Sequence, residues 1–465
     1  MKALALVSSC LGLLALGACA RPASPTLDPR HAIAARAQLD PSTSGLVLLA
    51  VDDADGDGWD DVACGMPFVS HGSSRESGAF ALLASDGSIA GPIEHGGDGE
   101  TLGYFLARDF DRDGDGVDDV IVTSPALGER ARSGGSILAY SPKARRFVSR
   151  CDAPAGLATL GLGVAAIEDR DGDLLADYAV IGSARADWRT EMGMLRIFSS
   201  SSGRELESIP LDELGGAERR FAADQILRVS SAELARPRPG PASAAGPSAP
   251  STHGDVLALA ATSSDRLVFV ELCSGAPIVL ASHVGPGFSG FGESLAPLDP
   301  RVASSFRAST WIVASRGRNV ELLTWPPGDA HVRSLSVGDH AQQLGASIAS
   351  CPDLDGDGVR DVVVGAPGPA ERGSFYGIEL KRTHTRRESS GYVLAVSSGS
   401  GQPIRRLQGE DPWFGRTVAV FENREQPERS RVDVGAGRPE SPVVYVFELT
   451  TGVQVARVQL PKSSR

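Results

Sequence analysis

Four stretches of the chain carry the same nine-residue acidic pattern, Asp-x-Asp-x-Asp-x-x-x-Asp, at residues 53–61, 111–119, 169–177 and 353–361. So many carboxylates in one short loop repel one another, and a hard divalent cation bound among them removes that repulsion. Because the pattern recurs with its positions aligned, it also indicates a chain built from repeated units. Metal binding and repetition together constrain the fold more than any other feature of the sequence.

The candidate ligands follow from the chemistry of calcium, which binds about six to eight oxygen atoms from carboxylates, backbone carbonyls and water. We expect the aspartates at loop positions 1, 3, 5 and 9 to supply carboxylates, and the residue at position 7 to supply its carbonyl. The predicted ligands, for up to four calcium ions, are Asp53, Asp55, Asp57, Trp59, Asp61, Asp111, Asp113, Asp115, Val117, Asp119, Asp169, Asp171, Asp173, Leu175, Asp177, Asp353, Asp355, Asp357, Val359 and Asp361. The alternative for each loop is a solvated acidic turn that holds no metal.

An EF-hand loop begins with the same residues, but it ends with a bidentate glutamate at position 12. Position 12 is held here by residues whose side chains do not bind calcium: Cys64, Val122, Val180 and Val364. β-branched apolar residues follow the loops, a composition typical of buried strands. The pattern therefore favours a strand–loop–strand site over a helix–loop–helix site.

Glycine at position 6 lets such a loop curl, because glycine adopts positive φ without strain. Gly58, Gly116 and Gly358 hold this position, whereas the third loop has Leu174. Holding a leucine at positive φ costs about 1 kcal/mol. We therefore expect the third loop to bend differently or to bind calcium less tightly.

The spacing of the loops indicates how many units the chain contains. Their first aspartates are separated by 58, 58 and 184 residues (53 to 111, 111 to 169 and 169 to 353), and the last gap is close to three periods. A small residue, usually glycine, stands eight residues before each first aspartate, and similar markers recur in the long gap and further on. The unit starts are then near residues 45, 103, 161, 222, 292, 345 and 415, which gives seven units.

Each unit contains about four strands separated by turn residues, and those of the second unit are predicted at 102–108, 120–124, 135–140 and 146–148. Four-stranded sheets repeated radially form a β-propeller, in which about four to eight blades are usual. We therefore predict an all-β fold in which residues 45–465 form a seven-bladed β-propeller of four-stranded antiparallel blades, with calcium loops in blades 1, 2, 3 and 6. A linear β-solenoid is the alternative, and a shared closing strand from residues 31–44 stays open.

The order of these features resembles the FG-GAP, or integrin α-chain N-terminal, repeat family. The Phe-Gly marker occurs as Phe291-Gly292 and Phe414-Gly415, and Gly365-Ala366-Pro367 matches the Gly-Ala-Pro end of the motif. The resemblance implies a seven-bladed propeller with calcium in the loop that joins the first two strands of a blade. Blades 4, 5 and 7 depart from the acidic pattern, so no calcium site is carried onto them.

The first residues read as an export signal. A charged start and a short apolar run end in Leu16-Gly17-Ala18-Cys19, which resembles a bacterial lipobox with Cys19 as the lipidated residue. Ordinary cleavage after Ala20 is the alternative. We predict a signal peptide at 1–19, a flexible tether at 20–44, and an exported protein that is either a cell envelope lipoprotein or secreted. A membrane is a predicted partner only through the N-terminal lipid.

The formal net charge of −13 argues against nucleic acid as a partner, because phosphate binding needs clustered Lys and Arg. The cysteines beyond the signal peptide fall in different units without CxxC spacing, so we expect buried free thiols, with a disulfide as the alternative. Two insertions interrupt the period, a Pro/Ala/Ser-rich stretch at 235–253 and a long turn at 369–390. Basic residues in the second insertion are a candidate contact for an acidic partner, and a solvated loop is the alternative.

The sequence contains no H-E-x-x-H, no G-x-S-x-G and no phosphate-binding glycine-rich loop. The favoured function is therefore a non-enzymatic, calcium-stabilised interaction or scaffold module that binds a protein or glycan at the cell surface. The alternative is a propeller enzyme, a hydrolase or lyase acting on surface polymers, with its site at the channel mouth. A purely structural role is a third candidate.

Overall fold

The computed structural model describes most of the chain beyond the first 44 residues. The described residues are 45–127, 134–155, 157, 159–181, 194–211, 214, 225–229, 255–261, 265–273, 277–285, 291–292, 294–298, 310–315, 319–324, 331–335, 343–368, 391–423, 426, 429–438 and 441–460. The predicted signal peptide, the tether and both insertions lie outside them. Within the described residues, no helix is long and apolar enough to span a membrane.

Twenty-eight strands form seven sheets of four antiparallel strands, and each sheet uses four strands that are consecutive in the chain. Blades 1 to 3 contain β1 (Val47–Val51), β2 (Asp61–Met66), β3 (Ala79–Leu83), β4 (Glu94–His95), β5 (Leu106–Arg108), β6 (Val120–Ser124), β7 (Ser136–Ser141), β8 (Arg146–Asp152), β9 (Gly163–Ile167), β10 (Asp177–Ile181), β11 (Met194–Phe198) and β12 (Glu205–Pro210). Blades 4 and 5 contain β13 (Gln225–Val229), β14 (Asp255–Ala261), β15 (Arg266–Leu272), β16 (Ile278–Val284), β17 (Ser294–Pro297), β18 (Thr310–Ser315), β19 (Asn319–Thr324) and β20 (His331–Leu335). Blades 6 and 7 contain β21 (Ser347–Cys351), β22 (Asp361–Ala366), β23 (Tyr392–Val396), β24 (Pro403–Gln408), β25 (Thr417–Glu422), β26 (Ser430–Arg438), β27 (Ser441–Glu448) and β28 (Gln454–Gln459).

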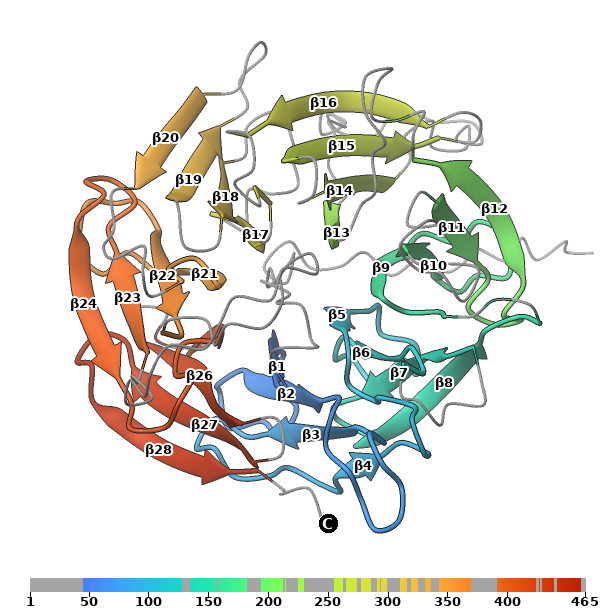
Figure 1. Ribbon diagram of the computed structural model, residues 1–465, viewed down its shortest axis with the longest axis horizontal. Helices are drawn as coiled ribbons and strands as arrows, with labels where there is room; N and C mark the ends of the chain where they lie inside the picture. Colours follow the sequence, from blue (N-terminus) through green and yellow to red (C-terminus); the bar gives the residue numbers. More distant parts are fainter. Residues whose placement is uncertain are drawn as a thin grey trace, which may run out of the picture.

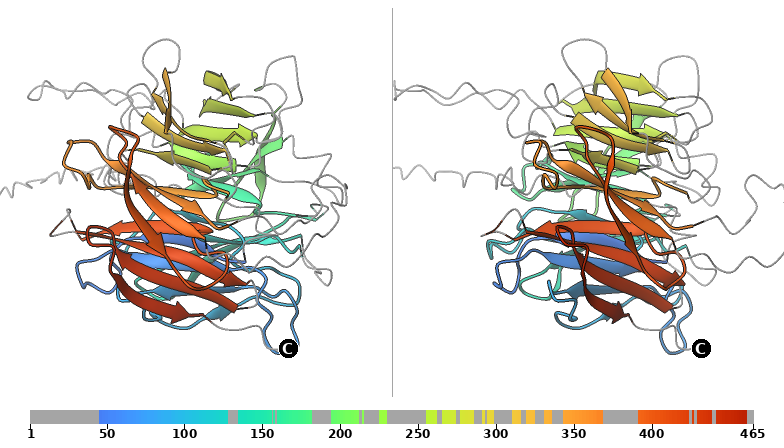
Figure 2. Two further views of the ribbon diagram at one scale, coloured as in Figure 1. Left: turned by 60° about the vertical axis from the view of Figure 1, so that its left-hand side comes forward. Right: turned by 90° about the vertical axis from the view of Figure 1, so that its left-hand side faces the viewer.

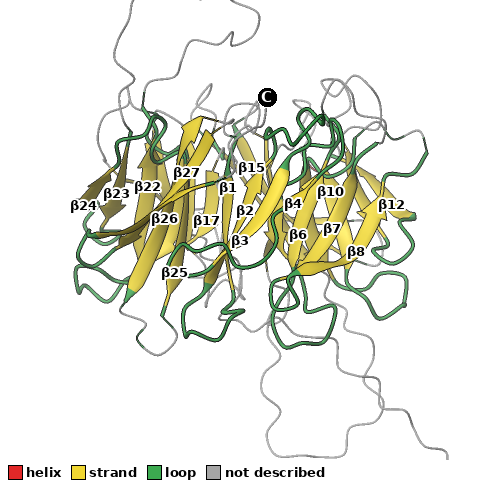
Figure 3. Ribbon diagram, turned by 90° about the horizontal axis from the view of Figure 1, so that it is seen from below, coloured by secondary structure: helices red, strands yellow, loops and turns green. Residues whose placement is uncertain are grey.

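The seven sheets stand around a common axis, with the first strand of each blade innermost and the fourth outermost (Figure 1). Two further views show the ring from the side as a disk (Figure 2). Strands run between the two faces of the disk, and the loops gather at those faces (Figure 3). The predicted seven-bladed propeller of four-stranded blades is confirmed, and a closed ring excludes the linear solenoid. Since each blade supplies its own four strands, the described ring closes without a shared strand.

The core of the protein lies between the blades. Among the described residues, seven clusters of buried apolar side chains occupy the seven interfaces between neighbouring blades, one cluster at each. Every residue of β2 is buried, whereas the outermost strand β28 has mostly exposed and half-buried residues. The inner strands therefore read as short continuous apolar runs, because both of their faces are covered.

Glycines allow neighbouring blades to approach closely at one end of the interface. A methyl group on Gly65, in the second strand of blade 1, would lie 2.2 Å from the carbonyl oxygen of Gly103 at the start of blade 2. The same group on Gly365 of blade 6 would lie 2.0 Å from the carbonyl oxygen of Gly415 at the start of blade 7. Gly103 and Gly415 also have φ angles of 83° and 89°, which glycine adopts without strain. The glycine near the end of the motif in one blade thus packs against the marker glycine that begins the motif in the next blade.

The predicted strand at 102–108 is wrong in its first half, since β5 begins at Leu106. The amides of Gly103 and Tyr104 both donate to the carbonyl of Thr123, and Gly103 has positive φ, so this stretch is a turn rather than a strand. None of the described cysteines, Cys64, Cys151, Cys273 and Cys351, is joined in a disulfide, and all but Cys273 are buried.

Candidate metal centres

Each acidic loop joins the first and second strands of its blade. The first loop connects β1 to β2, the second β5 to β6, the third β9 to β10, and the fourth β21 to β22. Strands on both sides of every loop exclude the EF-hand arrangement. Because the blades repeat one strand order around the ring, the four loops lie on the same face of the disk.

The aspartate at position 1 organises each loop through the backbone. In the first loop, Asp53 Oδ1 accepts a hydrogen bond from the amide of Gly56 (2.6 Å), and Oδ2 accepts one from the amide of Gly58 (3.0 Å). The aspartate at position 5, Asp57, accepts one from the amide of Trp59 (2.8 Å). The other three loops repeat these three bonds at the aligned positions. The aspartate at position 1 thus holds each curl, in addition to the glycine that the sequence predicted at position 6 of three loops.

Positions 4 and 6 carry the sharp bend. Gly56 and Gly58 have φ angles of 82° and 87°, and the corresponding glycines of the second and fourth loops also have positive φ. Leu174 has a φ of 72° and is 58% exposed, so the third loop keeps the common shape rather than bending differently. The strain of about 1 kcal/mol is therefore held in the loop, without compensating burial of the leucine side chain.

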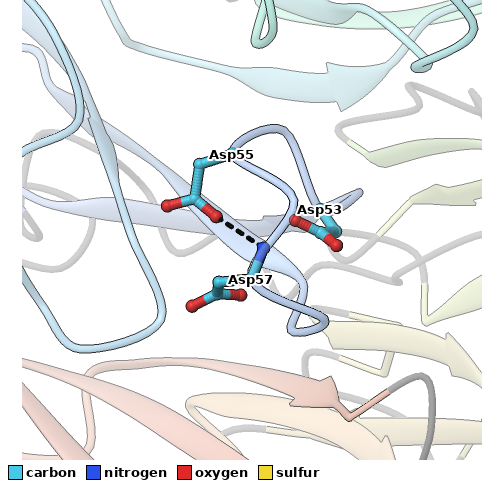
Figure 4. A group of neighbouring side chains, drawn as sticks. All are labelled: Asp53, Asp55 and Asp57. Atoms are coloured by element: carbon cyan, nitrogen blue, oxygen red, sulfur yellow. Dashed lines mark hydrogen bonds between the residues drawn. The ribbon is translucent and has the colours of Figure 1, made fainter.

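Three carboxylates converge in each loop. Figure 4 shows those of Asp53, Asp55 and Asp57, with the hydrogen bond between the Asp57 amide and Asp55. Ligand oxygens from the three side chains lie within 4.8 Å of one another. The aligned residues converge in the second loop (Asp111, Asp113 and Asp115) and in the fourth loop (Asp353, Asp355 and Asp357). In the third loop the position-9 aspartate replaces the position-5 aspartate, so the set is Asp169, Asp171 and Asp177.

The aspartate at position 9 is the buried member of each loop. Asp61, Asp119, Asp177 and Asp361 are at most 1% exposed. One oxygen of each accepts a hydrogen bond from the backbone amide at position 2, which closes the loop. Burial raises the pKa of these carboxyls, to about 7 for Asp61, about 8 for Asp119 and about 6 for Asp361, and neighbouring loop carboxylates raise it further. The same causes raise the pKa of Asp177.

In the described part of the chain, the second carboxylate oxygen of the position-9 aspartate accepts a hydrogen bond in two of the loops but not in the other two. The Oδ1 atoms of Asp177 and Asp361 each accept a hydrogen bond, at 3.1 Å, from the backbone amide of a serine between the third and fourth strands of the same blade. These serines are Ser200 and Ser398. The Oδ1 atoms of Asp61 and Asp119 are buried and have no partner among the described residues. In blade 2 the residue aligned with Ser200 is Pro142, which has no amide hydrogen to donate.

This donor set fits calcium. Carboxylate oxygens converge without sulfur or imidazole ligands, which matches the preference of a hard cation. Wholly buried and unpartnered oxygens on Asp61 and Asp119 are the groups that a bound cation would satisfy, since burying a carboxylate without a partner is costly. The backbone carbonyls at position 7 stay predicted ligands.

Serines at or just after the end of the third strand also contact three of the loops, and sequence reasoning missed them. Ser85 Oγ donates to Asp57 at 2.7 Å, and Ser141 Oγ donates to Asp115 at 3.1 Å. Ser201 makes the same bond to Asp173. A serine at or just after the end of the third strand was the available signal, but serine is common there and the pattern has no fixed distance from the aspartates.

The side chain at position 2 of each loop reaches the next blade. In the second loop, the guanidinium of Arg112 donates to Ser200 Oγ (2.8 Å) and to the carbonyl of Ala176 (3.0 Å), both in blade 3. Its carbon Cζ lies 4.8 Å from the ring centroid of Tyr178 on β10. Within blade 2 it forms a bidentate ion pair with the fully buried Asp109, at 2.5 and 3.0 Å.

The other three loops follow the same direction. Arg170 of the third loop donates to the carbonyl of Leu272 in blade 4 at 3.0 Å. Ala54 of the first loop packs into the cluster between blades 1 and 2, and Leu354 of the fourth loop packs into the cluster between blades 6 and 7. A loop held rigid by a metal would therefore stabilise an interface between blades as well as its own hairpin.

Comparisons with known proteins add the following. Residues 344–377 match the sequence model of the FG-GAP repeat. The sequence has no match among curated proteins. The structure is similar to the periplasmic gluconolactonase of Pseudomonas aeruginosa, with 13% identity and a TM-score of 0.46 over 90% of this chain and 98% of that one. It is also similar to the β-propeller domain of Myceliophteria thermophila Cps50 (Swd1), with 11% identity and a TM-score of 0.42 over 90% and 98% of the two chains.

Neither structural likeness carries an argument about activity. The family match has a specific place in the structure, because residues 344–377 include β21, the fourth acidic loop and β22, which ends in Gly365-Ala366. Residues 344–377 of this chain therefore match an FG-GAP repeat, and their described part, 344–368, lies in blade 6 of a seven-bladed β-propeller.

Proposed function

We propose that this protein is an exported, calcium-binding β-propeller that acts as an interaction or scaffold module at the cell envelope. The observation that carries the proposal is the recurrence of one loop geometry in four blades, each with three converging carboxylates and a wholly buried position-9 aspartate, which in the third loop is one of the three. Burying a carboxylate is costly unless a partner offsets its charge, and a bound cation would supply that partner. The proposal assigns no catalytic residue.

Calcium would have a structural role in this protein. Its charge would offset the repulsion among the loop aspartates, and four ions would return +8 against the formal charge of −13. Binding to the folded state alone stabilises by about 2.7 kcal/mol at a hundredfold excess of free ion over Kd. Extracellular sites bind calcium with a Kd of about 10⁻⁴–10⁻³ M, which suits export to a compartment where the ion is plentiful.

Chelation tests the metal directly. We expect EDTA to lower the melting temperature of the wild-type protein and calcium to restore it. Asp115→Ala, which removes a ligand from the second loop, should reduce that difference and lower the calcium stoichiometry by one in calorimetry. Asp86→Ala removes an exposed aspartate outside the loops and is the matched control. A melting temperature that ignores the chelator would refute the proposed calcium sites.

Export and anchoring rest on residues 1–19, which lie outside the described part of the chain. We propose that Cys19 carries the lipid, with cleavage after Ala20 as the alternative. Cys19→Ala should move the protein from the membrane fraction to the soluble envelope fraction if the lipid anchors it. An unchanged distribution would leave simple secretion.

The partner that we propose is a protein or glycan at the cell surface. The acidic charge disfavours nucleic acid. The basic insertion at 369–390 lies outside the described residues and stays a candidate contact for an acidic partner. A pull-down from envelope extract with and without calcium tests the module, and replacing Lys381, Arg382, Arg386 and Arg387 by Ser tests the insertion. Partner binding that does not change in this variant would remove the insertion from the proposal.

A further inference from the structure

The ring closes where blade 7 meets blade 1, and this interface, the seam, joins segments that are far apart in the sequence (Figure 1). Neighbouring blades elsewhere are linked by a connecting stretch of chain. At the seam, Arg431 of β26 and Ser85 of blade 1 are in contact across 346 residues. No short stretch of chain links blades 7 and 1, so the entropic cost of bringing them together is offset only by contacts across the seam.

Trp59, at position 7 of the first acidic loop, makes several contacts across the seam. It is 8% exposed, and its ring lies edge-on to Phe421 with a centroid distance of 6.3 Å. The guanidinium carbons of Arg431 and Arg429 lie 4.1 and 5.4 Å from the ring centroid. The backbone of Trp59 also forms an isolated antiparallel bridge with Asn423. A predicted ligand residue of blade 1 is thus held by blade 7.

A second route runs from the same loop to the same arginine. Asp57 Oδ1 accepts the amide hydrogen bond of Trp59, and Oδ2 accepts one from Ser85 Oγ at 2.7 Å. The carbonyl of Ser85 accepts a hydrogen bond from Arg431 Nη1 at 2.9 Å. The Asp57 carboxylate therefore contacts Trp59 and Ser85, two residues that Arg431 also contacts across the seam.

Blade 7 is built to receive this loop. Arg431 pairs with Phe421 in the β25–β26 ladder, as Asp61 pairs with Val51 in blade 1, so an arginine stands where the acidic blades have their position-9 aspartate. The other acidic loops carry Val117, Leu175 and Val359 at position 7, and none of these has an aromatic ring to offer a cation. The coupling to a neighbouring arginine through position 7 is therefore special to the first loop.

We propose that calcium in the first loop acts as a latch for the ring, so that occupancy of this one site controls closure of the seam. This inference rests on the proposed calcium binding. With the ion bound, Asp57 and the backbone of Trp59 are fixed, and Trp59 stays between Phe421 and Arg431. Without it, repulsion among Asp53, Asp55 and Asp57 loosens the loop and both routes to Arg431. By linkage, an ion that binds the closed form more tightly stabilises closure.

Hydrogen exchange of the full chain, read by mass spectrometry, tests the latch. In wild type we expect EDTA to accelerate amide exchange in β1, β25 and β26 by up to about 100-fold relative to calcium at a hundredfold excess over Kd. Asp57→Asn should exchange rapidly in these strands even with calcium present. Asp115→Asn is the matched control, because Asp115 has the same position and the same serine bond in a loop away from the seam. Its seam should stay protected in calcium.

Calorimetry on the same samples separates the two proposals. Loss of one calcium site in each variant, with loss of seam protection only in Asp57→Asn, supports the latch. Calcium binding without any calcium-dependent protection of the seam, or equal loss of protection in both variants, overturns the latch and leaves the calcium proposal standing. No calcium binding by the wild-type protein overturns both. Trp59→Leu should bind calcium at the first loop but lose the response of β25 and β26.

Discussion

Replacement of Arg112 by Met should be among the most damaging single changes in the described part of the protein. Asp109 is fully buried, and its partner Arg112 is 6% exposed and binds it through two hydrogen bonds. Removing the arginine leaves a buried carboxylate without a counterion, which costs about 3–5 kcal/mol. The change also removes the bonds from blade 2 to Ser200 and Ala176 in blade 3.

A double-mutant cycle separates the charge from the packing. Asp109→Asn keeps an acceptor for the amide of Phe110 but removes the charge. The loss of stability in the Arg112→Met, Asp109→Asn double variant should therefore be smaller than the sum of the two single losses by about 2 kcal/mol, a coupling within the range seen for residues of one network. Urea unfolding in saturating calcium, followed by circular dichroism, measures the free energy of unfolding of all four proteins. A loss below about 1 kcal/mol in Arg112→Met, or additive effects, would refute the reasoning.

Three further predictions concern the loops and the blade contacts. In EDTA, the free energy of unfolding should fall as pH rises from about 4 to 8, because the position-9 carboxyls have raised pKa values in the folded state and lose their protons in this pH range. Saturating calcium should reduce that fall. Chemical denaturation at a series of pH values measures both effects. Leu174→Gly should stabilise the protein by up to about 1 kcal/mol in urea unfolding, since it releases the strain at positive φ, and a loss of stability would contradict that view. Gly365→Ala should cost about 1–3 kcal/mol, because its methyl group would overlap the Gly415 carbonyl; an unchanged melting temperature would show that the two blades can separate freely at this point.

The parts of the fold that the sequence predicted are those encoded by local patterns that recur. The acidic loops, the marker glycines and the apolar runs between them repeat at a blade-sized interval, so the count of seven blades and the place of each loop followed from spacing. The prediction failed at the start of β5, where Gly103 forms a turn with Thr123. That contact depends on a carbonyl 20 residues away and leaves no periodic signal in residues 102–105.

The candidate site was predictable in its carboxylates but not in its surroundings. The bond from Ser85 to Asp57 and the contacts of Arg112 with blade 3 join residues separated by 28 to 88 positions. Which residues meet at such separations is fixed by tertiary packing, and one sequence gives no pattern that marks the pairs. The division of the position-9 aspartates into partnered and unpartnered forms depends on similarly distant residues, such as Pro142, which takes the place of Ser200 in blade 2.

Contacts between blades explain why the repeat motif has a glycine near its start and another near its end. The marker glycine that opens one blade packs against the motif glycine that ends the second strand of the preceding blade, as Gly103 does on Gly65 and Gly415 does on Gly365. A side chain at either place would push two backbones apart, so both positions are set by the interface rather than by the blade that contains them. The acidic loop at the other end of the same hairpin also reaches the next blade, through position 2. The motif is therefore best understood as the sequence of a blade–blade contact, in which glycines set the approach at one face and a metal loop would hold the interface at the other.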